Sequence, residues 1–213
     1  MNRNEKFVIT INRELGSGGR TVGEKLAERL GVPFYDKALI KALEEKYNLT
    51  VEEIERLKGR NHSWWADFKR VVSIGHALSN MQYYEINTAF APDILTTAEM
   101  FKAEVEILKG IAEEESCVIA GRTGFHVFRD HPNHLSILIK APLEQRILRL
   151  TAKRGISSEE AKAIIEKVDA QRENYVQKYT GTSRYSTHNY DLVISMKDKT
   201  EDEVTSLIMQ YIA

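Results

Sequence analysis

Short runs of consecutive apolar residues alternate along the chain with longer stretches in which apolar residues recur every three or four positions. The short runs are rich in aliphatic and β-branched residues, which is typical of strands buried on both faces of a parallel sheet. The runs that we interpret as strands are Lys6–Ile11, 33–36, 117–121, 135–141 and 191–196.

Helical spacing fills most of the chain between these runs. Val22, Leu26 and Leu30 share one face of a first helix, and Pro142 begins a later one. A Ser or Thr followed three residues later by Glu forms a capping box, which marks a helix start. Capping boxes begin at Thr50, Thr96, Ser157 and Thr200. The alternation predicts an α/β fold, in which ligands bind at the carboxyl ends of the parallel strands.

Composition limits the partners that such a fold would have. The 213 residues suit one large domain, or one core domain with an insert, and the net charge of −1 gives no basic field for a nucleic-acid polymer. No apolar stretch approaches the roughly 18 residues of a membrane span. Cys117 is the single cysteine, which fits a reducing compartment, and we expect a cytoplasmic protein.

A glycine-rich turn joins the first strand to the first helix. Gly16, Gly18 and Gly19 allow the backbone to curl so that main-chain N–H groups and the helix start face a phosphate. An ordinary glycine turn is the plain alternative. The dinucleotide fingerprint G-x-G-x-x-G fails because Thr21 occupies its last position, although Asp36, after the second strand, keeps a ribose-binding role open.

The turn departs from the phosphate-loop pattern G-x-x-x-x-G-K-[ST] at its lysine. One alignment places Glu14 at the first glycine and Arg20 at the lysine, whereas the other places Gly19 at the lysine. In both, Thr21 offers a hydroxyl for Mg²⁺. Arg20 is the cation inside the turn, and it either reaches the phosphates or points outward and pairs with Glu24 at i+4.

Other cations lie in segments that follow the predicted strands. Arg146 and Arg149 share one helix face, Asp169 and Arg172 lie three residues apart on the next helix, and Arg122 directly follows a buried strand. Arginine suits phosphate because its planar fork donates two hydrogen bonds and stays ionised. A solvated helix face and an ordinary ion pair are the alternatives for the two helices.

Several segments together resemble the cytidylate kinases, and more closely the cytidylate kinase-like group of P-loop proteins. "ITINRELGSGGRTVGEKLAERLGVPFYDK" is similar to the kinases' phosphate loop and first helix. "CVIAGRTGFHVFRDHPNHLSILIKAPLEQRILRL" resembles their Gly-Arg-Asp segment and the beginning of their lid, and "KVDAQRENYVQKYTG" the last part of that lid. The resemblance implies a P-loop NTPase-type parallel sheet flanked by helices, with a helical insert and a helical lid.

The resemblance also implies transfer of the γ-phosphate of ATP, bound with Mg²⁺, to a nucleoside monophosphate such as CMP. Asp36 and Arg122 match acceptor positions, whereas Arg146 and Arg149 match lid arginines that reach the phosphates. The residues that match the ATP phosphate loop are Gly16, Ser17, Gly18, Gly19, Arg20 and Thr21. We therefore expect Arg20, Arg122, Arg146 and Arg149 to be catalytic, with Asp169 and Arg172 in the lid.

This chain departs from the kinases at three points: the loop lysine is absent, Thr123 replaces the Asp of Gly-Arg-Asp, and residues 46–100 do not resemble the cytosine-binding insert. An ATP-binding module with weak or no turnover, in a sensory or assembly role, is therefore a second hypothesis. A dinucleotide-dependent oxidoreductase is a third.

We expect one domain, with a core of 1–45 and 116–213, a helical insert of about 46–115 and a lid of about 143–182. The insert concentrates aromatic residues at 62–68 and 81–90. These would wall a nucleoside pocket, fill the core of the insert, or join two copies in a homo-oligomer.

Overall fold

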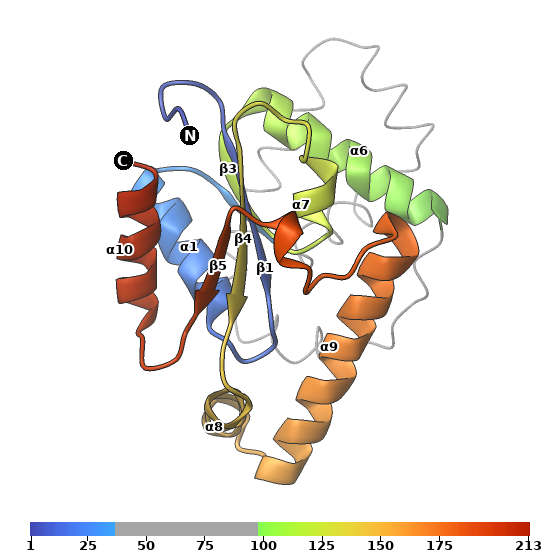
Figure 1. Ribbon diagram of the computed structural model, residues 1–213, viewed down its shortest axis with the longest axis vertical. Coiled ribbons are helices and arrows are strands. Elements are labelled where there is room, and N and C mark those ends of the chain that lie inside the picture. The colour runs from blue at the N-terminus through green and yellow to red at the C-terminus, as the bar shows by residue number, and fades with distance from the viewer. Residues whose placement is uncertain (37–97) are drawn as a thin grey trace. The chain divides into compact units, whose positions relative to one another are not determined.

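The computed structural model describes residues 1–36 and 98–213 (Figure 1). The chain forms two compact units, of which the first joins Met1–Tyr35 to Ile111–Ala213 and the second is Asp36–Gly110. The predicted helix starts at Thr50 and Thr96 and the aromatic segments 62–68 and 81–90 lie outside the described residues. The division into core, insert and lid therefore stays a prediction.

A five-stranded sheet forms the centre of the first unit, in the spatial order β2-β3-β1-β4-β5. Its strands are β1 (Val8–Arg13), β2 (Phe34–Asp36), β3 (Cys117–Ala120), β4 (His134–Lys140) and β5 (Leu192–Ser195). The pairs β1–β3, β1–β4 and β4–β5 are parallel. This sheet confirms the predicted parallel α/β fold and places the five predicted strand runs in one sheet.

Helices follow the strands, and two short helical segments, Gly124–Val127 and Thr187–Asn189, are present that the sequence pattern did not predict. The helices are α1 (Gly19–Leu30), α6 (Ala98–Glu114), α7 (Gly124–Val127), α8 (Leu143–Arg154), α9 (Ser158–Thr180) and α10 (Glu201–Tyr211), with a 3-10 turn η1 at Thr187–Asn189. The capping boxes at Ser157 and Thr200 are both formed, with the side chain of each accepting from the N–H of the Glu three residues later. Among the described residues, no helix is both long and apolar enough to span a membrane.

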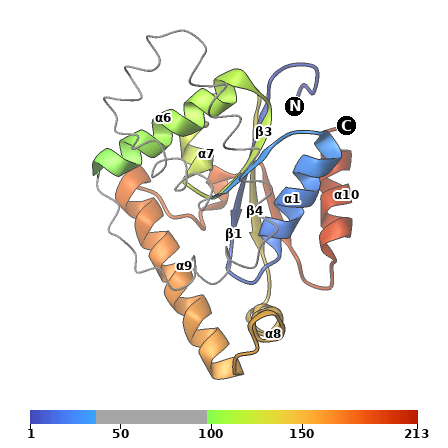
Figure 2. The ribbon, with the colours of Figure 1, turned by 180° about the vertical axis from the view of Figure 1, so that it is seen from behind.

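Opposite faces of the sheet carry different helices. Figures 1 and 2 show α1 and α10 side by side along one face, where Lys25 and Arg29 of α1 both pair with Asp202 of α10. On the other face α7 packs on β1 and β4, and a side chain at Gly124 would lie 2.8 Å from a methyl carbon of Thr10.

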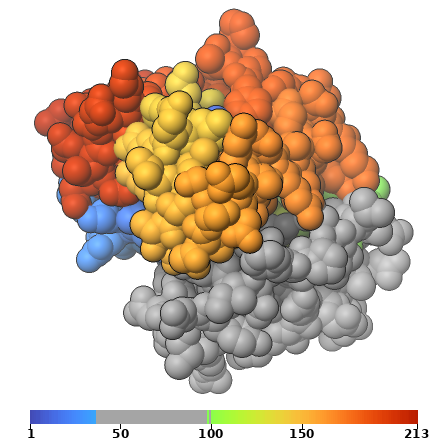
Figure 3. Space-filling model, turned by 90° about the horizontal axis from the view of Figure 1, so that it is seen from below, coloured from blue at the N-terminus to red at the C-terminus, as the bar shows by residue number. Residues whose placement is uncertain are grey.

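The carboxyl ends of the strands are covered by α8 and α9. Seen from below in Figure 3, α8 (yellow) and α9 (orange) lie against each other at this edge of the first unit. They share a small apolar cluster of Leu150, Ala161 and Ile165, and Leu15 of the glycine turn packs against it. The turn and the α8–α9 pair are therefore held together by apolar contact as well as by charge.

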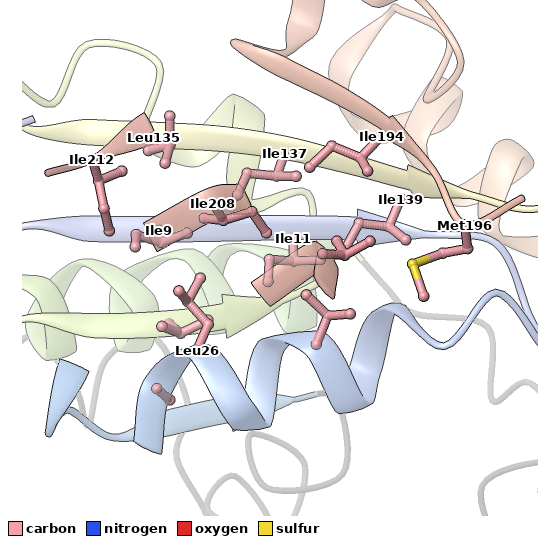
Figure 4. Packing of buried hydrophobic residues seen from close by; sticks show 14 of the residues in the cluster. Ile9, Ile11, Leu26, Leu135, Ile137, Ile139, Ile194, Met196, Ile208 and Ile212 are labelled. Carbon is pink, nitrogen blue, oxygen red and sulfur yellow. The ribbon is translucent and has the colours of Figure 1, made fainter. Parts of the chain in front are cut away.

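The main core lies between the sheet and the α1–α10 pair (Figure 4). Because side chains alternate along a strand, Ile9 and Ile11 face this core, whereas Thr10 faces α7. Leu26 of α1 and Ile208 of α10 close the core from the helix side, and both are fully buried. This packing fixes the start of α1 at the carboxyl end of β1.

Candidate active site

The glycine turn is the connection between Arg13, which ends β1, and Gly19, which begins α1. Gly16 and Gly18 have φ angles of 78° and 84°, a left-handed backbone that favours glycine. The N-cap residue of α1, Gly18, makes no side-chain cap, Ser17 Oγ accepts the N–H of Gly19 at 3.3 Å, and the first turn has no acidic residue. A helix start of this kind presents main-chain N–H groups and a positive dipole end to an anion.

The same glycines allow α8 to lie directly on the turn. A side chain at Gly16 would come within 2.8 Å of the main-chain oxygen of Arg146. A side chain at Gly18 would come within 2.7 Å of Nη1 of Arg149. The turn therefore has room for the two predicted lid arginines because it has no side chains of its own there.

Four arginines donate to main-chain oxygens of β1 and the turn. Arg146 Nε donates to Leu15 O at 2.7 Å, and Arg149 Nη1 donates to Ser17 O at 2.6 Å. From α9 and the segment after it, Arg172 Nη1 and Arg184 Nη2 donate to the carbonyl of Arg13 at 3.0 and 2.5 Å. The structure thus brings Arg146, Arg149 and Arg172, all named as candidates from the sequence, into contact with the main chain of β1 and the turn.

Asp169 is the carboxylate that joins these arginines. It pairs with Arg146 through a short contact, and its Oδ1 lies 3.6 Å from Arg172 and 3.5 Å from Arg184. Oδ1 also accepts the N–H of Leu15 at 3.1 Å. The side chain of Asp169 is nearly buried, so the carboxylate acts in a setting where water screens it little.

Two further carboxylates bind the outer arginines. Glu14 lies 3.5 Å from Arg146 and accepts the N–H of Ala141 at 2.9 Å, and Glu201 pairs with Arg149 at 3.0 Å. Within this cluster of described residues, four guanidinium groups face three carboxylates.

Burial, together with the charges of Arg13 and Arg184, lowers the pKa of Arg172 to about 9, although Asp169 acts to raise it. At neutral pH the guanidinium of Arg172 is still protonated. Neighbouring cations that depress one another in this way are stabilised by an added anion, because an opposite charge favours the ionised form. The site therefore has the electrostatics of an anion-binding site.

Arg20 takes the second of the two orientations that the sequence allows. Its Nη1 pairs with Glu24 at 2.9 Å, and its guanidinium lies 5.9 Å from the centre of the Phe34 ring. Thr21 is exposed in the first turn of α1, and its place as a Mg²⁺ ligand stays a prediction.

The predicted acceptor residues lie at the carboxyl end of β2 and directly after β3. Gly121, Arg122 and Thr123 all have left-handed backbone, with φ angles of 83°, 56° and 53°. For Arg122 and Thr123 this conformation is strained, and such strain clusters at functional sites. Asp36 ends β2, is buried and belongs to the second unit. Its role and that of Arg122 in binding an acceptor stay predictions.

Sequence reasoning missed Arg184 and Arg13. Arg184 is fully buried although it lies in an irregular segment before β5, where no helical or strand periodicity marks it. Arg13 is the last residue of β1, and only the structure shows that its side chain lies against Gly19 and Gly121. The signal for Arg13 was present in the spacing of the loop, where it precedes Gly18 by five positions.

A separate cavity of about 490 Å³ lies on the α7 face of the sheet. His134 and Ser136 line it, and they stand opposite Val8 and Thr10 near the amino end of β1, whereas the glycine turn follows Arg13 at the other end. Burial lowers the pKa of His134 to about 4, so its imidazole is neutral at pH 7. The residues that line this cavity include none of Arg146, Arg149, Asp169, Arg172 and Arg184.

The parallel sheet, the glycine turn at the start of α1 and the helices on both faces define a P-loop NTPase-type fold. The sequence identifies the family within this class of fold. The model of the Cytidylate kinase-like family matches residues 8–198, and the chain belongs to that family. Membership confirms the resemblance found in the sequence and supports a kinase-like phosphotransferase that uses nucleotides.

Relatives cover nearly the whole chain at low identity. The cytidylate kinase of Methanopyrus kandleri is 25% identical over 210 residues, which cover 94% of this chain and 90% of that protein. An S-adenosylmethionine-dependent nucleotide dehydratase of Lacinutrix mariniflava is 27% identical over 212 residues, 97% of this chain but 36% of that protein. A crystal structure of an uncharacterized protein from Eubacterium ventriosum covers 98% of each chain with 24% identity and a TM-score of 0.70, so it shares the fold.

Proposed function

We propose that the protein transfers the γ-phosphoryl group of ATP to a nucleoside monophosphate, with a CMP-like acceptor. The observation that carries the proposal is the cluster of four arginines that donate to main-chain oxygens of β1 and the glycine turn, beside the start of α1. The name cytidylate kinase, carried by relatives that match over most of their own length, supports the choice of acceptor.

Phosphoryl transfer demands mainly positioning and positive charge on the phosphate oxygens. Each guanidinium has five N–H donors, and the contacts of Arg149 with Ser17 and Glu201 use two of its nitrogens, so donors remain for phosphate. Bound Mg²⁺-ATP would supply the transferred group and a metal that neutralises its charge. In this proposal the start of α1 and Arg149 bind the donor phosphates, Thr21 offers its hydroxyl to the metal, and residues 143–182 form the lid.

On the acceptor side we propose Arg122 and Asp36. The left-handed backbone at Arg122 places this residue directly at the carboxyl end of β3, which neighbours β1 in the sheet. A guanidinium at that edge suits the phosphate of a monophosphate.

The ion pair between Arg20 and Glu24 favours a second candidate function. If no other cation replaces the loop lysine, the protein would bind ATP through main-chain N–H groups and the lid without efficient transfer. Turnover separates this ATP-binding module from the kinase.

We expect Mg²⁺-ATP to raise the melting temperature and NADH to leave it unchanged. A ligand that binds the native state alone stabilises it, by about 2.7 kcal/mol at a hundred times its Kd. The cluster favours a polyphosphate, whereas the glycine turn lacks the dinucleotide pattern. Thermal denaturation with each ligand, at equal concentration and ionic strength, measures the difference. Stabilisation by NADH with none by Mg²⁺-ATP would contradict the proposal.

A further inference from the structure

The glycine turn exchanges two residue types relative to the standard phosphate loop. In the pattern G-x-x-x-x-G-K, counting from Gly18 places Arg13 at the first glycine and Gly19 at the lysine. A cation therefore stands where glycine is expected, and glycine stands where the cation is expected. The hydroxyl residue Thr21 comes one position later than in that pattern.

The structure explains why the two changes occur together. A Cβ atom at Gly19 would lie 2.7 Å from Cβ of Arg13 and 3.1 Å from Cβ of Ile139. Real Cβ atoms do not approach a neighbouring side chain so closely without displacing it, since interiors are close-packed. The side chain of Arg13 thus occupies the space that the Cβ of a lysine at position 19 would need.

The Arg13 side chain runs from Gly19 toward the carboxyl end of β3. Its Nη1 occupies the space that a Cβ would need at Gly121, which has a left-handed φ of 83°. Gly121 immediately precedes Arg122. The guanidinium of Arg13 therefore lies between the glycine turn and the proposed acceptor edge.

The charge of Arg13 also reaches the lid. After burial, it is the largest influence that lowers the pKa of Arg172. Arg13 ends the strand that precedes the turn, whereas Arg149 comes from α8 and donates to the carbonyl of Ser17 in the turn. The two cations thus flank the turn from different elements.

We propose that Arg13 is the cation of this phosphate loop and contacts the nucleotide phosphates in place of the missing lysine. The inference rests on the proposed function in one respect, that the site takes a polyphosphate. A guanidinium donates two parallel hydrogen bonds to phosphate oxygens in a fixed planar geometry, which suits the position of Arg13 at the edge of the turn.

The test is the affinity for inorganic tripolyphosphate, measured by calorimetry on the full chain. We expect Arg13→Gln to weaken binding at least tenfold, because it keeps most of the side-chain length and removes the charge. Arg20→Gln is the matched control, since it removes a charge from the same segment that the structure pairs with Glu24, and it should stay within twofold of wild type. Equal affinities for Arg13→Gln and wild type would overturn the proposal.

A second pair of variants tests the exchange itself. Arg13→Gly opens the space beside position 19 and should lose affinity as Arg13→Gln does, whereas Arg13→Gly combined with Gly19→Lys restores the standard pattern and should regain most of it. A double variant as weak as Arg13→Gly would count against the exchange. If Arg13→Gln fails to fold, this pair decides the question.

These experiments need no turnover, so they separate the two proposals. A wild-type protein that binds tripolyphosphate but transfers no phosphoryl group would overturn the kinase and leave the role of Arg13 in binding standing. If Arg13→Gln binds tripolyphosphate with wild-type affinity while the wild-type protein transfers phosphoryl groups, the role of Arg13 is overturned and the kinase stands.

Discussion

Asp169→Ala is expected to lower the free energy of unfolding by about 3–5 kcal/mol, the usual cost of removing one partner from a buried ion pair. The substitution leaves Arg146 and Arg184, with 8% and 0% of their side chains exposed, without their shared carboxylate. It also removes the acceptor of the Leu15 N–H. Urea denaturation followed by circular dichroism measures the loss.

Glu201→Ala is the control for this prediction. Glu201 also pairs with an arginine of the cluster, but 29% of its side chain is exposed. Exposed pairs contribute about 0–1 kcal/mol, so the control should lose no more than that. Similar losses in both variants would show that Asp169 does not hold the cluster together.

Arg149→Ala is expected to reduce kcat/KM for ATP about a hundredfold, roughly 2.7 kcal/mol, as for loss of one preorganised transition-state donor. The guanidinium of Arg149, a predicted lid arginine, lies against Gly18 at the start of α1. Steady-state kinetics with ATP as the varied substrate measures the effect.

Arg20→Ala provides the comparison. Arg20 pairs with Glu24 one helical turn along α1, and such pairs contribute about 0.3–0.5 kcal/mol to stability. We expect its kinetics to stay within twofold of wild type. A hundredfold loss in Arg20→Ala with little change in Arg149→Ala would return the role of the loop cation to Arg20.

The fold could be predicted because its signals are local. Apolar runs marked the strands, and the capping boxes at Ser157 and Thr200 marked the starts of α9 and α10. The position of Arg146 and Arg149 beside the glycine turn could be predicted because helical spacing places residues three apart on one face, and a helix that follows a strand lies at the carboxyl edge.

The remaining site residues depend on contacts that sequence spacing does not encode. From the sequence, Arg20 could either reach phosphates in the turn or pair with Glu24 at i+4. Only the three-dimensional structure shows that it pairs with Glu24. Arg184 is brought to the carbonyl of Arg13 across 171 positions of the chain, by a segment without periodicity. Asp169 could be paired with Arg172 from spacing, but its contact with Leu15 N could not.

The most direct test of the account is phosphoryl transfer itself. Wild-type protein with Mg²⁺-ATP is incubated with a panel of nucleoside monophosphates, and ADP and the nucleoside diphosphate product are quantified by chromatography against a reaction without acceptor. We predict ADP release above that control with at least one monophosphate, highest with CMP, together with an equal amount of the matching diphosphate. ADP release that no acceptor raises, from a protein that binds ATP, would contradict the kinase and support the ATP-binding module.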